Sequence, residues 1–134
     1  LADLGSGAGF PGLIMAIYNR NPLFHVKLYE KSKIKRNFLI KLVNDMGIKC
    51  DIHENVYNSN SIRSDYILCR AFKKLQEVIK ISREIVKKPH KLIVLKGKNA
   101  QEEINNVSKV EKFDYKLIKS ITDNDSKILV ANFI

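Results

Sequence analysis

Three glycines near the start of the chain have the spacing of a ligand-binding loop. Gly5, Gly7 and Gly9 follow the strand-like residues 1–4 and precede the apolar run 13–17. Glycines allow positive φ and let a backbone approach a ligand without intervening Cβ atoms. Pro11 suits the first turn of the helix that follows. The segment therefore predicts a ligand cradle at a strand-to-helix turn.

The residues beside these glycines indicate the ligand. A dinucleotide loop, G-x-G-x-x-G, needs a small last residue so that the helix N-terminus can meet a pyrophosphate. Counted from the first glycine, that position holds Phe10; counted from the second, it follows Pro11, which lacks an N–H. G-x-G-x-G after Asp3 suits S-adenosylmethionine, because a carboxylate can attract its ammonium group and Phe10 can cover its apolar parts. We favour a methyltransferase over a dehydrogenase, and the absence of Gly-Lys-Ser/Thr excludes a P-loop.

Two charged residues at expected strand ends extend this site. Glu30 ends the segment 25–30, where an acidic side chain accepts both ribose hydroxyls in such folds. Its alternative is a solvated charge paired with Lys31 or Lys33. Arg70 follows the segment 65–69 at the carboxyl edge of the sheet, where ligands of open α/β folds bind. We expect Arg70 to contact cofactor or RNA, and the alternative is a structural ion pair.

The remaining reactive residue types show no catalytic or metal-binding spacing. His25, His53 and His90 have no carboxylate or cysteine partner at a spacing typical of a catalytic or metal site, so we assign them no chemical role. Cys50 and Cys69 lack CxxC spacing and lie in apolar segments, which indicates buried thiols in a reducing compartment. No apolar run approaches the roughly 20 residues that span a bilayer. We expect a cytoplasmic protein without metal or membrane contact.

Strand-like apolar runs alternate with helix-period segments, which predicts an α/β fold with a mostly parallel sheet and helices on both faces. The length suffices for one domain, 1–134, and not for two. The expected strands are 1–4, 25–30, 48–53, 65–69, 91–96, 112–119 and 127–133. The expected helices are 11–19, 33–46, 74–87 and 100–107, with a polar loop at 55–64.

Helix 33–46 has a regular apolar pattern. Leu39 and Val43 broaden its expected buried face, and Gly47 supplies a left-handed stop. The centre of that face is predicted from apolar residues four positions apart: Ile34, Phe38, Leu42 and Met46.

The net charge of +10 and the pI near 9.6 are typical of a protein that binds the phosphates of nucleic acid. Lys, Ile and Asn are abundant together, so an A/U-rich genome is an alternative cause of the charge. Charge alone therefore leaves nucleic-acid binding open.

Four segments in fixed order resemble a known family. They are residues 3–12 (DLGSGAGFPG), 35–39 (KRNFL), 70–72 (RAF) and 95–97 (LKG). Together they resemble the bacterial ribosomal RNA small-subunit methyltransferase G family, also called glucose-inhibited division protein B. The resemblance covers nearly the whole chain. A glycine loop that contains Phe-Pro, together with the Arg-Ala-Phe segment, is a more specific signature than the glycine loop of methyltransferases in general.

The resemblance implies a Rossmann-like class I methyltransferase that transfers a methyl group from S-adenosyl-L-methionine to N7 of a guanine in 16S ribosomal RNA. It implies the strand order 3-2-1-4-5-7-6 with the last strand antiparallel, so Cys50 and Cys69 cannot bond. The chain departs from the family at 55–57, where Asn-Val-Tyr replaces Arg-x-Glu. Carried over by position, the family's cofactor contacts fall on Gly5, Phe10, Val56, Tyr57 and Arg70.

Guanine N7 carries a lone pair in its neutral form, so methyl transfer needs no general base and we assign no catalytic residue. Alignment of the reacting atoms can supply roughly 7–11 kcal/mol. For phosphate contacts to RNA we favour Arg36, in the basic run that enters helix 33–46, and Lys96 at another strand end. The alternative functions are a small-molecule methyltransferase and a noncatalytic nucleotide-binding module.

The first residues bear on the extent of the domain. The chain lacks an initiator Met and begins in a strand, so we expect an N-terminally truncated domain whose full-length form is a monomer. Without the family's N-terminal helices, we expect low stability and an exposed apolar patch on one sheet face, lined by residues of 1–4, 65–69 or 91–96.

Overall fold

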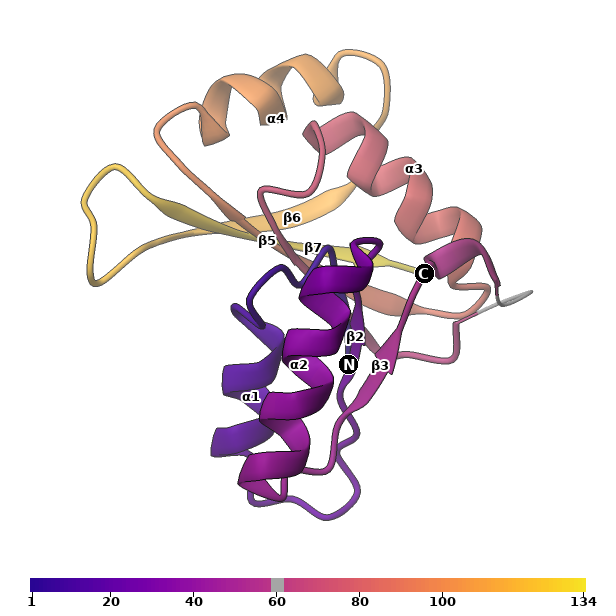
Figure 1. Ribbon diagram of the computed structural model, residues 1–134. Coiled ribbons are helices and arrows are strands. Elements are labelled where there is room, and N and C mark those ends of the chain that lie inside the picture. Colours follow the sequence, from indigo (N-terminus) through magenta and orange to yellow (C-terminus); the bar gives the residue numbers. More distant parts are fainter. Residues whose placement is uncertain (59–61) are drawn as a thin grey trace.

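The computed structural model describes residues 1–58 and 62–134 (Figure 1). Within these residues, seven strands form one sheet in the order β3-β2-β1-β4-β5-β7-β6. The strands from β3 to β5 are parallel, and β7 is antiparallel to both β5 and β6. The predicted fold and strand order are confirmed. The strands are β1 (Ala2–Leu4), β2 (Lys27–Tyr29), β3 (Asp51–His53), β4 (Tyr66–Arg70), β5 (His90–Lys96), β6 (Asp114–Lys119) and β7 (Lys127–Phe133).

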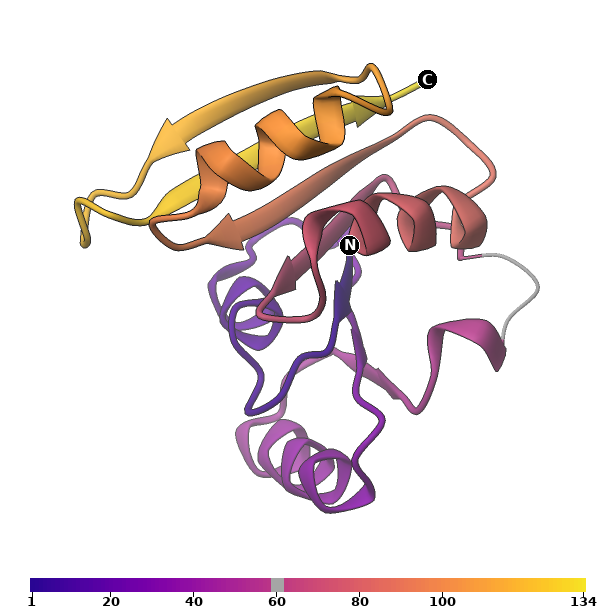
Figure 2. The same ribbon diagram turned by 90° about the horizontal axis from the view of Figure 1, so that it is seen from above.

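Helices cover the sheet in two pairs (Figures 1 and 2). The first pair is α1 (Gly12–Tyr18) and α2 (Lys33–Met46), and the second is α3 (Leu75–Ile85) and α4 (Ala100–Ser108). A short 3-10 turn, Val56–Asn58, follows β3 and lies in the expected loop 55–64, of which 59–61 fall outside the described residues. The bounds of α2 and β7 match the prediction, and the other elements differ by one to three residues at their ends.

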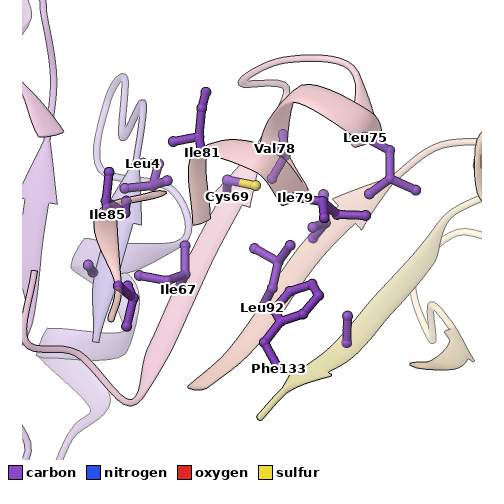
Figure 3. Packing of buried hydrophobic residues seen from close by; sticks show 14 of the residues in the cluster. Leu4, Ile67, Cys69, Leu75, Val78, Ile79, Ile81, Ile85, Leu92 and Phe133 are labelled. Atoms are coloured by element: carbon purple, nitrogen blue, oxygen red, sulfur yellow. The ribbon is translucent and has the colours of Figure 1, made fainter. Parts of the chain in front are cut away.

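The main core lies between the sheet and the second helix pair (Figure 3). Alternate residues of the central strands, such as Leu4, Ile67 and Leu92, point to this side because strand side chains alternate between faces. Val78 and Ile79 of α3 are fully buried against them. This packing holds the carboxyl ends of β1, β4 and β5 at one edge of the molecule.

A smaller core lies under the first helix pair, and it corrects the predicted face of α2. Leu39 and Val43 are the buried residues of this helix, whereas Ile34 and Phe38 are 83% and 52% exposed. Residues four apart advance 40° around a helix, so the predicted stripe drifts away from a straight contact face. The residues expected only to broaden the face are its centre.

The sheet face that carries α1 and α2 is partly uncovered over β5 and β7. Ile93 and Leu95 alternate with core residues of β5 and pair across the sheet with Val130 and Ile128. All four side chains are only partly buried, and none belongs to either core cluster. The exposed apolar patch expected on this face is not found at these positions: Ile93 and Leu95 are partly buried rather than exposed. In β1 and β4 the corresponding Asp3 and Leu68 are buried.

Candidate functional site

The three glycines form a tight loop after β1. Gly5, Gly7 and Gly9 all have positive φ, at 72°, 60° and 94°. A Cβ atom on Gly5 would lie 2.6 Å from the ring of Phe72, and one on Gly9 would lie 2.8 Å from Leu13. A Cβ atom on Gly7 would meet no atom closer than Gly5 O, at 4.0 Å. Two glycines therefore allow close packing beneath the loop, and Gly7 forms its open side.

Asp3 supports this loop from beneath. Its Oδ2 accepts hydrogen bonds from Ser6 Oγ at 2.9 Å and from the Gly12 N–H at 3.0 Å. The residue is 1% exposed, and burial raises the pKa of its carboxyl, against the lowering effects of Ser6, Gly12 and Arg70. The sequence suggested that this carboxylate attracts a ligand ammonium group. The structure instead places it inside the protein, bonded to the loop.

Glu30 lies against the open side of the loop. Its Oε2 accepts the Gly7 N–H at 2.8 Å, and its Oε1 accepts the Ser32 N–H at 2.8 Å. Glu30 is 8% exposed, so it is not the solvated strand-end charge that the sequence left as an alternative. Each carboxylate oxygen keeps a second acceptor position, because one oxygen can accept two hydrogen bonds. The carboxylate can therefore bind vicinal hydroxyl groups at this position.

Phe10 and Arg70 form the other side of the site. The Arg70 guanidinium carbon lies 5.8 Å from the centre of the Phe10 ring, within range of a cation–π interaction. Arg70 ends β4, and the preceding Cys69 pairs with Leu4 at the end of β1. Phe10 is 49% exposed, so an apolar surface remains accessible beside the loop.

The two residues expected at the end of β3 are placed differently from each other. Val56 is 5% exposed and packs in the main core. Tyr57 is 60% exposed, and its N–H donates to Asn55 Oδ1 at 3.0 Å. Both lie beyond the carboxyl end of β3, the strand edge at which Glu30 follows β2 and Arg70 ends β4. The contacts of the structure bring together the glycine loop, Glu30, Phe10 and Arg70, and they do not extend to Val56 and Tyr57 within the described residues.

The two cations expected to contact RNA are engaged within the chain. Arg36 Nη1 donates to the carbonyl oxygens of Glu30 and Lys31, and Nη2 lies 3.3 Å from Glu54 Oε1. Lys96 Nζ donates to Glu103 Oε2 at 2.7 Å. Their side chains are 15% and 14% exposed. The RNA contacts of both residues remain predictions.

Two residues that support the site had no role in the sequence interpretation. The Phe72 ring packs on Gly5 and fixes the start of the loop. Glu103 Oε2 accepts both Lys96 Nζ and, at 3.1 Å, the Leu75 N–H at the start of α3. Phe72 could have been found, because it belongs to the Arg-Ala-Phe segment. Glu103 had no sequence signal, because the fold alone brings it to both partners.

A groove of ≈ 610 Å³ lies between α3 and α4 beside this edge. Phe72, Lys74 and Lys96 line it, together with Glu103 and Val107. Phe72 lines this groove, and its ring also lies against Gly5, so the groove and the glycine loop share this residue.

Solved structures share the fold of this chain. A SAM-dependent methyltransferase from Aquifex aeolicus matches with a TM-score of 0.76 at 13% identity, covering 99% of this chain and 81% of that chain. An rRNA methylase from Streptococcus thermophilus matches with a TM-score of 0.66 at 12% identity, covering 98% and 83%. The fold is the Rossmann-like fold of the S-adenosylmethionine-dependent methyltransferases.

Sequence comparison identifies the family within this class. The model of the GidB family, rRNA small subunit methyltransferase G, matches residues 1–129. The protein of that name from Pelagibacter ubique is 35% identical over 132 residues, which cover 96% of this chain and 62% of the relative. The Orientia tsutsugamushi (strain Ikeda) protein is 35% identical over 129 residues, covering 96% and 63%. The chain belongs to the rRNA small subunit methyltransferase G family.

The chain spans about three fifths of the length of these curated relatives. Among its described helices, none is both long and apolar enough to cross a membrane. Residues 1–58 and 62–134 contain no group of three or more His, Cys, Asp or Glu side chains that could hold a metal ion.

Proposed function

We propose that this chain is the methyltransferase domain of an enzyme that methylates N7 of a guanine in small-subunit ribosomal RNA, with S-adenosyl-L-methionine as the methyl donor. The observation that carries the proposal is the position of Glu30, whose carboxylate meets the Gly7 N–H at the open side of the loop, in a chain that the family model covers over residues 1–129. A buried acid at that position is suited to an adenosine ligand.

The residues present fit the cofactor. Glu30 would accept the ribose hydroxyls, and the side of Gly7 without a Cβ atom would let the ligand reach the backbone. Phe10 would cover apolar parts of the ligand, and Arg70 would approach from β4. Gly5 and Gly9 would shape the loop, while Val56 and Tyr57 would bound the site after β3. The bound cofactor would supply an electrophilic methyl group on a sulfonium.

Catalysis by this chain would rest on positioning. The N7 lone pair of neutral guanine attacks the methyl carbon directly, so no side chain has to remove a proton beforehand. Asp3 is buried under the loop and Glu30 is bonded to backbone N–H groups, which suits supporting roles for both. Orientation of the reacting atoms can lower such a barrier by roughly 7–11 kcal/mol.

The RNA substrate would approach the carboxyl edge of the sheet, where exposed lysines follow three strands. Lys31 and Lys33 follow β2, Lys74 follows β4, and Lys98 follows β5. Such cations would hold phosphates and orient the RNA without reading its sequence. The net charge of +10 agrees with this partner. We further propose that the protein acts in the cytoplasm as a monomer.

Incubation with labelled S-adenosylmethionine tests the proposal against its alternatives. We expect label in the RNA of unmethylated small ribosomal subunits, and none with subunits that already carry the modification. Label in small molecules of a cell extract, but not in RNA, would instead assign a small-molecule methyltransferase. Binding of the cofactor without transfer to any acceptor would indicate a noncatalytic module.

A further inference from the structure

We propose that Arg36 is a positioning residue, whose guanidinium fixes the turn after β2 and thereby holds the Glu30 carboxylate at the glycine loop. The proposal rests on the proposed function in taking Glu30 as the cofactor-binding acid. It gives Arg36 a role within the protein that differs from the RNA contact expected from the sequence.

One guanidinium joins two strand ends. Arg36 Nη1 donates to Glu30 O at 3.0 Å and to Lys31 O at 2.7 Å, so it binds two successive carbonyls of the turn. Nη2 lies 3.3 Å from Glu54 Oε1, just beyond β3. The Arg36 side chain is 15% exposed, whereas that of Glu54 is 60% exposed. The guanidinium is thus mostly enclosed and oriented by three oxygen atoms.

The same turn places Glu30. The Glu30 carbonyl accepts from Arg36, while the carboxylate of the same residue accepts the Gly7 and Ser32 N–H groups. The Glu30 N–H donates to His53 O at 3.0 Å. Every polar group of Glu30 is therefore bonded. Movement of the turn would shift the carboxylate away from Gly7, because the backbone carbonyl bound by Arg36 and the carboxylate belong to the same residue.

An arginine suits this position better than a lysine. The planar guanidinium presents its N–H groups in a fixed fork, and hydrogen bonds from a charged donor are stronger than neutral ones. A lysine ammonium is a single point and cannot reproduce the fork to two carbonyls and a carboxylate. Arg36 is also held at its own backbone, where its N–H donates to Ser32 O at 2.9 Å in the first turn of α2.

The test compares Arg36→Lys with Lys41→Ala, which removes one exposed charge from the same helix. Hydrogen exchange at the Gly7 and Ser32 amides, measured without cofactor, is the first readout. We expect faster exchange at these amides in Arg36→Lys. In Lys41→Ala the exchange rates should equal those of the parent protein. Unchanged exchange at both amides would overturn the proposal, whether or not the protein binds S-adenosylmethionine.

The second readout is calorimetric affinity for S-adenosylmethionine, measured beside RNA binding as a function of salt. Arg36→Lys should weaken cofactor binding about tenfold, because the acid is no longer held in place. Glu54→Gln, which removes only the ion pair, should weaken it less. Arg36→Ala should leave the salt dependence of RNA binding unchanged. If Arg36→Ala instead lowered the slope of log affinity for RNA against log salt concentration by about 0.7–0.9, and left the cofactor affinity unaltered, the proposal would be overturned and Arg36 assigned a phosphate contact. Failure of the parent protein to bind the cofactor would refute the proposed function alone, because the exchange readout stands without it.

Discussion

At the scale of single residues, Gly12 and Asp3 show how closely the loop is packed. A Cβ atom on Gly12 would lie 2.5 Å from Asp3 Cβ and Oδ2 and 2.7 Å from Leu28. Gly12→Ala should therefore lower the free energy of unfolding by about 1–3 kcal/mol, as overpacked buried sites do. Urea unfolding measures this. Gly97→Ala is the matched control, because no atom lies within 4 Å of its added Cβ atom; equal effects in both variants would contradict the packing argument.

The second prediction at the residue scale concerns the carboxylate of Glu30. Glu30→Ala removes the acceptor of the Gly7 N–H, which is also the acceptor that we propose for the ribose hydroxyls. Cofactor binding should weaken by roughly 1–3 kcal/mol, the loss expected for a charge-assisted hydrogen bond. Titration calorimetry gives this difference directly. Unchanged affinity would remove Glu30 from the site.

The sequence predicted residues whose position follows from a motif, and it missed partners that only the fold brings together. Glu30 was predicted from its place at a strand end after the glycine loop, and Arg70 from the carboxyl edge of the sheet. The contacts of the structure place both residues beside the loop. The partners of Arg36 and Lys96 could not be predicted, because no spacing in the sequence indicates the bonds to Glu54 and Glu103.

At the scale of elements, Glu103 links three of them. Its carboxylate binds Lys96 at the end of β5 and the first N–H of α3, while Glu103 itself belongs to α4. Glu103→Ala should lower the free energy of unfolding by about 1–2 kcal/mol, because a helix start loses its acceptor and a partly buried lysine loses its partner. Lys96→Ala and the double variant complete a mutant cycle in urea. Additive effects would show that the pair is not coupled.

The alternation of strand and helix patterns predicted the elements well, because each pattern has its own period. The contact face of α2 was predicted wrongly for a physical reason. Most of its apolar residues lie on one broad side, and the sequence alone does not show which part of that side meets α1 and β2. Leu39 packs against the glycine loop, since a Cβ atom on Gly9 would lie 3.2 Å from its side chain.

At the scale of the whole molecule, Cys69 reports on global unfolding. Burial raises the pKa of its thiol from 9.0 to about 12, and that of Cys50 to about 11. Both thiols are free, as predicted. We expect Cys69 to react with a maleimide at pH 8 only at the rate of unfolding, since the thiolate is the reactive form. Rapid labelling in the absence of denaturant would contradict its burial.

The same raised pKa gives a pH dependence. Because the unfolded thiol ionises near 9.0 and the folded one near 12, the contribution of Cys69 to stability is complete below pH 9 and is lost as the pH rises toward 12. Cys69→Ser, which keeps a small side chain but does not ionise in this range, should show a smaller loss of stability between pH 9 and 11. Equal losses in both proteins would contradict this account.

The central proposal is that N7 of a guanine in small-subunit ribosomal RNA receives the methyl group. Small-subunit ribosomal RNA is incubated with the protein and labelled S-adenosylmethionine, digested to nucleosides, and separated by chromatography with mass detection. We predict that the label is found in 7-methylguanosine, and that Glu30→Ala lowers its yield at limiting cofactor. Label in any other nucleoside, or none in RNA to which both protein and cofactor bind, would contradict the account.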